Sequence, residues 1–168
     1  PDTEEDAPLS DADKRALLSL ARTTITEVLM ADALPLPRAR RPALNARRGA
    51  FVTLKKGGQL RGCIGHMTAD WPVQKTVGAM AVQAAFNDRR FTPVSAGELD
   101  RLSIEISVLT PHRPVPGPES IRVGTDGVVI KKAGKSAVYL PQVAVEQGWS
   151  REEMLDHLCR KAGLPAGA

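Results

Sequence analysis

The residues with the clearest chemical potential in this sequence lie in one short run, LRGCIGH, at positions 60–66. Cys63 stands two residues after Arg61, and two glycines, Gly62 and Gly65, flank it. A guanidinium beside a thiol favours the thiolate, which is the form that attacks electrophiles and binds metals. Glycine weakens a strand and often marks either a bulge or a place where something must approach the backbone closely. The run therefore predicts a thiol-centred site in which Cys63 is the nucleophile or redox thiol and Arg61 is its charge partner.

A β-hairpin is expected to position this run. Residues 50–54 alternate in polarity, and the turn sequence Lys-Lys-Gly-Gly separates them from the run itself, as in two strands joined by a tight turn. Because side chains alternate along a strand, Arg61 and Cys63 should share one face, and Leu60 and Ile64 should point to the other. The two glycines would then let a substrate reach exposed backbone amides beside the thiol.

Two interpretations of Cys63 stay open at this level. Most free cysteines are small buried hydrophobes, and packing alone would then explain this residue. The neighbouring arginine and glycines favour the reactive interpretation instead. Cys159, the second cysteine, lies on the apolar stripe of a predicted helix and is expected in the core. Two cysteines in dissimilar contexts do not make a disulfide framework, so reduced thiols in a cytoplasm are expected.

Residues further along the chain are candidates for the same site. Asn87 and Arg90 follow an alanine-rich segment, and they would bind an anionic group if they line the cleft of Cys63. In the alternative interpretation, Arg90 only pairs locally with Asp88. Glu105 lies on the polar face of a predicted strand, where it is either solvated or an acid near that cleft.

His66 closes the run and also has two interpretations. It could act as a base or a metal ligand if the strand ends at the preceding glycine. In a straight strand it would point away from Cys63, and it is then a surface histidine. The predicted site thus has Cys63 and Arg61 as catalytic residues. Its predicted binding residues are Gly62, Gly65, His66, Asn87, Arg90 and Glu105.

The remaining segments predict helices and hairpins around this site. Helix starts are indicated at four places, by Ser10, by Pro72, by the pair Ser95 and Glu98, and by the pair Ser150 and Glu153. The first of these helices should run to about residue 33. Alternating residues predict further strands over 103–109, 127–132 and 136–140. Hairpins with intervening helices favour an α+β fold with a largely antiparallel sheet flanked by helices.

The domain organisation expected from the sequence is simple. Residues 1–9 are acidic, lack periodicity and predict a disordered tail. Residues 10–168 predict one domain, in which a proline-rich loop at 111–118 joins two lobes.

Five blocks of the sequence together resemble one known family. The run LRGCIG is followed by AAFNDRRF, IEISVL, YLPQVAVEQGW and LCRKAGL, which span about residues 51–164 and resemble the AMMECR-one domain family. The resemblance implies a larger α/β lobe and a smaller lobe, and it implies no established activity. Prokaryotic members are similar to protein A of the AmmeMemoRadiSam system, which implies Memo-type and radical-SAM partner proteins.

The chain departs from the family pattern in three ways. Family members commonly have a threonine- or serine-type residue where this chain has His66, and proline where it has Arg89. They also continue into a final aromatic-containing strand, so the C-terminal end after Ala168 is expected to be incomplete.

Composition excludes several classes of protein. A hydrophobic content of 42% and a charged content of 25% are ordinary for a globular domain. No apolar run approaches the ~20 residues of a membrane span, and the acidic N-terminus lacks the features of a signal peptide. The histidines are far apart and no Cys-x-x-Cys or phosphate-binding loop occurs, so neither a metal site nor a cofactor is expected.

Nucleic-acid binding is an alternative that the sequence supports weakly. The pI is near 9.4, and one segment is arginine-rich, with Arg38, Arg40, Arg41, Arg47 and Arg48. Against it, the net charge is only +4 and aromatic residues make up 4%, without a stacking pattern. We expect these arginines on a solvated face. A non-catalytic module that binds a protein or a nucleic acid remains the alternative to an enzyme.

Overall fold

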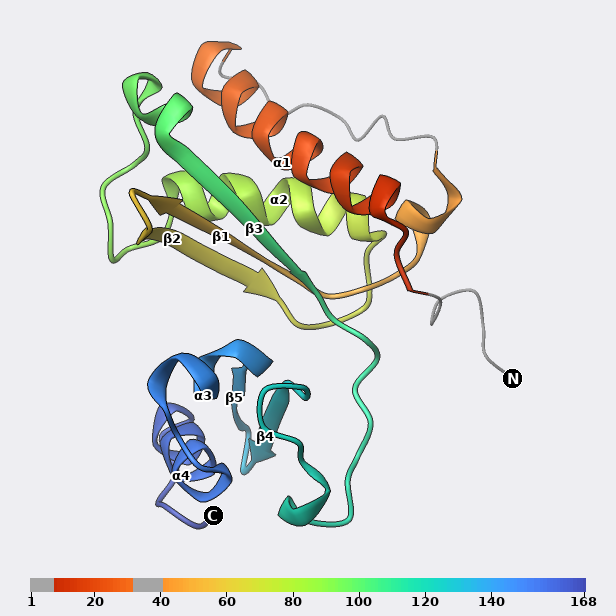
Figure 1. The fold of residues 1–168 in the computed structure, drawn as a ribbon, viewed down its shortest axis with the longest axis vertical. Helices are drawn as coiled ribbons and strands as arrows, with labels where there is room; N and C mark the ends of the chain where they lie inside the picture. Colours follow the sequence, from red (N-terminus) through yellow and green to blue (C-terminus); the bar gives the residue numbers. More distant parts are fainter. Residues whose placement is uncertain (1–7, 32–40) are drawn as a thin grey trace. The chain divides into compact units, whose positions relative to one another are not determined.

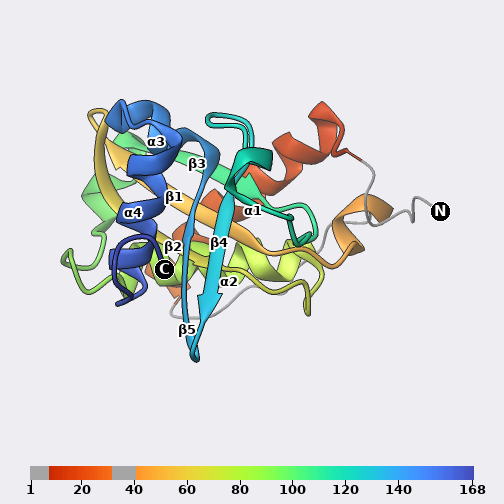
Figure 2. The same ribbon diagram turned by 90° about the horizontal axis from the view of Figure 1, so that it is seen from below.

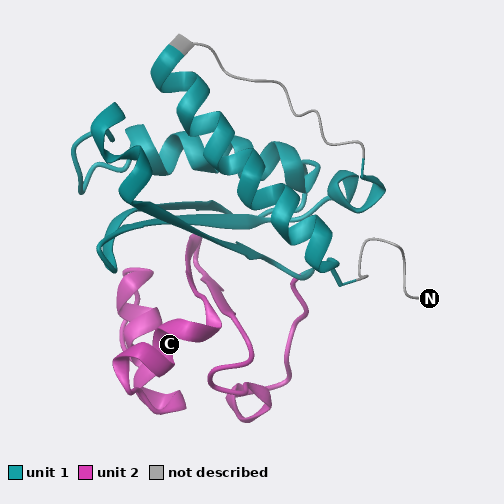
Figure 3. Ribbon diagram, turned by 45° about the horizontal axis from the view of Figure 1, so that its top comes forward, with its two compact units in different colours: residues 1–111 teal, residues 112–168 magenta. Residues whose placement is uncertain are grey.

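The computed structural model of the chain describes residues 8–31 and 41–168. The tail predicted for residues 1–9 therefore lies almost wholly outside the described residues. The chain divides into two compact units, residues 1–111 and residues 112–168, which Figure 3 shows in different colours. We describe each unit by itself.

The first unit is a three-stranded antiparallel sheet with two helices. Its strands are β1 (Ala50–Lys56), β2 (Gln59–His66) and β3 (Leu102–Val108), in the spatial order β2-β1-β3. The helices α1 (Asp11–Ala31) and α2 (Val73–Phe86) lie on the same face of this sheet (Figure 1). Two short 3-10 helices, η2 (Pro42–Asn45) and η3 (Ala96–Arg101), complete the unit. Both strand edges, β2 and β3, lack a further strand among the described residues.

The core of the first unit lies between the helices and this face of the sheet. Alternate residues of β1 point to it, and Val52 and Leu54 are fully buried. They meet small side chains of α2, since alanines such as Ala81 and Ala84 bring that helix close to the strands. The other face of β1 carries half-buried residues, of which Thr53 belongs to the site described below.

Three helix starts predicted by capping are confirmed. Ser10 caps α1, because the N–H of Asp13 donates to its hydroxyl and Ser10 donates back to the carboxylate. Capping boxes also open η3, at Ser95, and α4 in the second unit, at Ser150. The described part of α1 ends at Ala31, so its predicted end near residue 33 lies outside the described residues.

The second unit is a hairpin with two helices. Strands β4 (Val128–Lys132) and β5 (Lys135–Tyr139) pair antiparallel, and Figure 2 shows them side by side. They are preceded by the 3-10 helix η4 (Pro118–Ser120) and followed by α3 (Pro141–Gln147) and α4 (Arg151–Lys161). Met154, Leu158 and Cys159 of α4 are buried, as predicted for its apolar stripe.

The architecture confirms an α+β fold with antiparallel sheets. The predicted strands agree with β3, β4 and β5 to within a residue or so at each end. In the described part of the chain, no helix combines the length and the apolar character that a membrane crossing requires.

Candidate functional site

Cys63 lies in the middle of the edge strand β2, opposite Thr53 of β1. Thr53 in turn lies opposite Glu105 of β3, so the three residues form one row across the sheet. Because Val52 and Leu54 point toward the helices, this row lies on the opposite face. The Cys63 Sγ and the Thr53 Oγ1 are 3.1 Å apart and share a hydrogen bond. The sequence predicted Cys63 and Glu105 as site residues, but not Thr53.

A second set of contacts holds the backbone of Cys63. Its N–H donates to Asp88 Oδ2 at 2.9 Å, and Arg90 Nη2 donates to its carbonyl oxygen at 3.2 Å. Arg90 also donates twice to the carboxylate of Asp88, at 3.0 and 2.8 Å. We call this arrangement the Asp88–Arg90 clasp. It satisfies the two backbone groups that the edge strand would otherwise leave open.

The clasp also sets the electrostatics around the thiol. Hydrogen bonds from Arg90 hold the pKa of Asp88 well below its usual range, and the N–H of Cys63 acts in the same direction. The pKa of Arg90 is raised, chiefly by its hydrogen bonds to Asp88 and further by charge interactions with Asp88 and Cys63. Asp88 is buried, with 4% of its side chain exposed, whereas 58% of the Arg90 side chain is exposed. Arg90 is therefore a solvent-accessible cation that interacts with Cys63.

The strict alternation predicted for β2 is wrong at Arg61. Leu54 pairs with Gly62 but Lys55 pairs with Leu60, so Arg61 is an extra residue in a β-bulge. A bulge shifts the alternation by one residue, and Arg61 therefore does not share a regular strand face with the thiol.

The guanidinium of Arg61 binds elsewhere. It donates to both carboxylate oxygens of Glu98, at 3.0 and 3.1 Å, and to the carbonyl oxygens of Thr92 and Pro93, at 2.8 and 3.3 Å. These bonds, together with one from Lys56, hold the pKa of Glu98 well below its usual range. No hydrogen bond or ion pair joins Arg61 to the thiol in the described part of the chain.

The two glycines of the run have packing roles. Gly62 is buried under α2, and a Cβ atom there would overlap the carbonyl oxygen of Ala84. Gly65 lies opposite Phe51, whose ring occupies the space that a Cβ would need. The expectation that these glycines open the backbone to a substrate is therefore wrong for Gly62, and the ring of Phe51 covers Gly65.

His66 is the last residue of β2, and its side chain belongs to a group separate from the row of Cys63, Thr53 and Glu105. Its Nε2 lies 2.7 Å from Asp70 Oδ1 and 2.8 Å from Thr68 Oγ1, and its ring stacks on Trp71 with centroids 4.7 Å apart. The hydrogen bond to His66 is the main cause that lowers the pKa of Asp70. His66 pairs with Ala50, on the helix-facing side of the sheet, so it does not meet Cys63.

Asn87 also lies apart from the thiol. It caps the C-terminus of α2 and lines a shallow hollow formed by Gln83, Phe86, Asn87, Asp88, Arg89 and Phe91. Neither Cys63 nor Arg90 lines this hollow, so it is not the common cleft that the sequence predicted for Asn87, Arg90 and Cys63. Glu105 forms an ion pair with Lys55 at 2.8 Å, and 55% of its side chain is exposed.

The arginine-rich segment is only partly described. Arg38 and Arg40 lie outside the described residues. Arg41 pairs with Asp13, and hydrogen bonds from Ser10 and Arg41 lower the pKa of Asp13 to about 2. Arg47 donates to the backbone carbonyl of Asp70. Arg48 is only 5% exposed, so a solvated position is wrong for this residue.

Neither metal nor disulfide chemistry has a visible site here. Both cysteines are free, and within residues 8–31 and 41–168 no three side chains of the histidine, cysteine or acidic type gather as metal ligands. The chemical groups of the described site are the thiol of Cys63, the hydroxyl of Thr53 and the guanidinium of Arg90.

Comparisons with known proteins extend across both units. The family model described as AMMECR1 matches residues 18–168. A protein from Methanothermobacter thermautotrophicus is 44% identical over 166 residues, which cover 95% of this chain and 86% of that protein. A protein from Thermococcus gammatolerans is 42% identical over 160 residues, covering 89% of this chain and 78% of that protein.

A solved structure agrees with these matches. The crystal structure of uncharacterized protein PH0010 from Pyrococcus horikoshii superposes with a TM-score of 0.85 at 40% sequence identity, covering 89% of this chain and 79% of that one. The fold, the blocks of sequence and the family model agree, and the chain belongs to the AMMECR1 family.

Proposed function

We propose that this chain is an enzyme component that acts on a small molecule through Cys63, as a nucleophile or redox thiol. The observation that supports this most directly is the environment of the sulfur. Cys63 Sγ shares a hydrogen bond with Thr53 at 3.1 Å, and the exposed guanidinium of Arg90 binds the carbonyl oxygen of the same cysteine. A hydroxyl donor and a nearby cation both favour negative charge on sulfur.

In this proposal each residue has a distinct task. Thr53 donates its hydroxyl hydrogen to the thiolate, and Arg90 supplies positive charge and binds an anionic group of the substrate. Asp88 is a positioning residue, because it orients Arg90 and holds the N–H of Cys63. Glu105, in the same row on β3, is ion-paired with Lys55, and the proposal assigns it no chemical step. Arg61 contributes through its ion pair with Glu98, which positions β2.

The chemical step requires no cofactor for an electrophilic substrate. The thiol proton passes to solvent, the sulfur electron pair forms a bond to an electrophilic carbon, and the bonding electrons leave with the displaced group.

Partner proteins follow from the family resemblance. Similarity to protein A of the AmmeMemoRadiSam system supports Memo-type and radical-SAM proteins as partners, which would supply or consume the substrate of Cys63. The names of the relatives state no activity, so this part of the proposal is supported by the family resemblance alone.

The test is selective alkylation. Limiting iodoacetamide at neutral pH, followed by peptide mapping, should modify Cys63 before Cys159, which is only 4% exposed. Denatured chain supplies the control, since both thiols should then react at similar rates. A Cys63 that reacts in the folded chain no faster than in the denatured chain would argue against an activated thiol.

A binding module remains the second candidate, and one observation favours it. Strand β3 has no neighbour on its outer side among the described residues, and an apolar groove lies beside it. Nucleic-acid binding has less support, because Arg41 is already paired with Asp13 and Arg48 is buried.

A further inference from the structure

The ring of Phe51 lies beside the row that contains the thiol. Phe51 is two residues before Thr53 on β1, so both side chains point to the face of the sheet opposite the helices. Its partner across the hairpin is Gly65, which is two residues after Cys63 on β2. Phe51 and Cys63 are therefore diagonal neighbours on one face of the sheet, and an aromatic side chain can span that separation.

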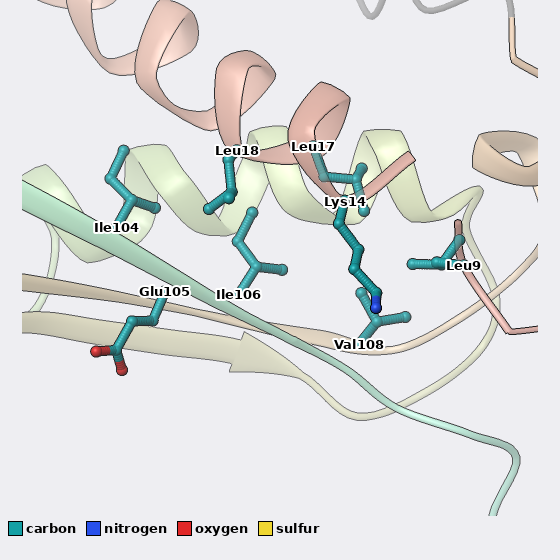
Figure 4. A pocket seen from close by; sticks show the side chains of 8 residues that line it. All are labelled: Leu9, Lys14, Leu17, Leu18, Ile104, Glu105, Ile106 and Val108. Carbon is teal, nitrogen blue, oxygen red and sulfur yellow. The ribbon is translucent and has the colours of Figure 1, made fainter. Parts of the chain in front are cut away.

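The side chains of β3 show the same division between the two faces of the sheet. Ile104 and Ile106 border the apolar groove under α1, whereas the carboxylate of Glu105 points away from the other side chains that line it (Figure 4). Glu105 is in the row of Thr53 and Cys63. The side chains of this row, and the ring of Phe51 beside them, thus project away from the helices.

The ring of Phe51 lies flat on the backbone of Gly65. A Cβ atom at Gly65 would stand only 2.2, 2.3 and 2.5 Å from the ring atoms Cδ1, Cγ and Cε1 of Phe51. Three consecutive ring atoms at nearly equal distances place this position over the face of the ring and not beside its edge. A side chain at Gly65 would push the ring away from the strand, so the glycine allows the ring to lie parallel to the sheet.

One face of the ring is therefore occupied, and the other is turned away from the sheet. An aromatic ring can serve to cover a strand glycine, and this accounts for the inner face alone. Phe51 and Cys63 are both half-buried, so solvent reaches both side chains. Planar groups stack on aromatic faces, and here such a face lies next to a thiol. The contact of Phe51 with Gly65 joins two adjacent strands and does not depend on an open edge of the sheet.

We propose that Phe51 is a binding residue of the Cys63 site, and that the substrate carries a planar unsaturated group which stacks on the outer face of its ring. The anionic group bound by Arg90 completes this substrate class, which is a planar acid with an electrophilic carbon. Arg90 reaches the cysteine from the outer edge of β2, and the Phe51 ring lies further along the strand, so the two contacts flank the sulfur from different directions. This inference rests on the proposed function, because it names the substrate of the same thiol.

Matched alkylating agents test the stacking. N-phenyl iodoacetamide and N-cyclohexyl iodoacetamide have the same reacting carbon, but only the phenyl group is planar. With either reagent, the thiolate sulfur forms a bond to the methylene carbon, and iodide leaves with the bonding electrons. Because one thiolate attacks both reagents, the ratio of the two rates does not depend on the pKa of the thiol. A free peptide of residues 60–66 gives the intrinsic ratio, and the Cys63→Ser chain measures any reaction of Cys159, which is subtracted.

The native chain should favour the phenyl reagent by about fivefold relative to the free peptide, as expected for a stacked aromatic pair. Phe51→Leu keeps an apolar cover on Gly65 and should lose this preference, whereas Phe51→Tyr keeps the ring and should retain it. Phe91→Leu is the matched control, because it removes a ring whose centroid is 5.5 Å from Cζ of Arg90 but which lies outside the row. The Phe91→Leu chain should retain the preference.

A third reagent adds the negative charge. N-carboxyphenyl iodoacetamide carries a carboxylate on the same planar ring. It should react with the native chain about threefold faster than the phenyl reagent, after the same correction with the free peptide, because it is attracted by the exposed guanidinium of Arg90. Arg90→Gln should remove this gain. Equal corrected rates for the two aryl reagents in the native chain would overturn the acidic part of the substrate class.

Three further results would overturn the proposal. If Cys63 is activated but shows no preference for the phenyl reagent, the Phe51 ring is not a binding surface, and the proposed thiol chemistry stands without it. A preference that survives Phe51→Leu, or that is lost in Phe91→Leu instead, would assign the stacking to another ring. A Cys63 that reacts with every reagent no faster than the free peptide would overturn both this proposal and the proposed function.

Discussion

Arg90 donates a hydrogen bond to the backbone carbonyl oxygen of Cys63 at 3.2 Å, while its other bonds tie it to Asp88. The cation near the thiol is thus hydrogen-bonded to the backbone of the residue that carries the thiol. Arg61, two residues from Cys63 in sequence, is instead bound to Glu98. Arg90, and not Arg61, is therefore the arginine whose loss should affect the thiol.

Replacing Arg90 should slow the alkylation of Cys63. Arg90→Gln removes the accessible positive charge near sulfur, and we expect the rate at neutral pH to fall by about fivefold. Arg61→Gln should leave the rate close to that of the native chain, since the hydrogen bonds of its guanidinium go to Glu98 and to the carbonyl oxygens of Thr92 and Pro93, and none goes to Cys63. The measurement is the iodoacetamide rate as a function of pH for both variants. A larger fall in the alkylation rate for Arg61→Gln than for Arg90→Gln would show that Arg61, and not Arg90, is the charge partner of Cys63.

The hydroxyl of Thr53 should matter to the thiol and little to folding. Thr53→Val keeps the shape of the side chain and removes the hydrogen bond to Cys63 Sγ. We expect slower alkylation with a change in unfolding free energy of about 1 kcal/mol or less. Ser107→Ala, on the same face of β3, should change neither quantity. Equal rates for the native chain and Thr53→Val would exclude a role of this hydroxyl in activating the sulfur.

Adding a methyl group at Gly62 should destabilise the fold strongly. Gly62→Ala forces a Cβ against the carbonyl oxygen of Ala84, and neither backbone can move without shifting α2 or β2. We expect a loss of about 2–4 kcal/mol in unfolding free energy, measured by urea denaturation. Gly97→Ala is the control, because a Cβ there meets no neighbouring atom and the backbone is not left-handed. A stable Gly62→Ala chain would contradict the packing described for β2.

Acid should weaken the link between Arg61 and Glu98. The pKa of Glu98 in the folded chain lies below its ordinary value of 4.5, chiefly because of hydrogen bonds from Arg61. A carboxylate with a lowered pKa stabilises the fold fully above its ordinary pKa, and the contribution is lost as the pH falls below it. Glu98→Gln should therefore cost about 2 kcal/mol at pH 7, since bonds to a charged group are lost.

The difference between Glu98→Gln and the native chain should shrink as the pH falls below 4.5. Urea denaturation of both proteins across this range supplies the measurement. A constant difference down to strongly acidic pH would mean that the charge of Glu98 does not contribute.

The parts of the fold that are encoded locally could be predicted from the sequence. Ser10 and Ser150 predict the starts of their helices, because a capping residue acts only on the next three residues. The strands could be predicted for the same reason, since alternation is a local pattern.

The site was harder to predict because it depends on register. One extra residue at Arg61 moves its guanidinium away from the regular strand face. The glycines of the run LRGCIGH can mark a bulge, but they do not show which residue is the extra one. The roles of Thr53 and Gly62 depend equally on distant partners, Cys63 across the hairpin and Ala84 on α2. The sequence allowed a local pair of Asp88 and Arg90, but it did not predict that this pair binds the backbone of Cys63 at the edge of the sheet.

The Asp88–Arg90 clasp also makes the backbone of Cys63 different from the rest of the sheet. The strands pair with one another through neutral amide bonds, which dissolved ions hardly affect, whereas the outward backbone groups of Cys63 are bound by an ion pair whose arginine is 58% exposed. Ionic strength should therefore weaken this contact with the Cys63 backbone more than the bonds between the strands. The thiol is thus carried by a backbone segment with one anchor that responds to the salt content of the surroundings.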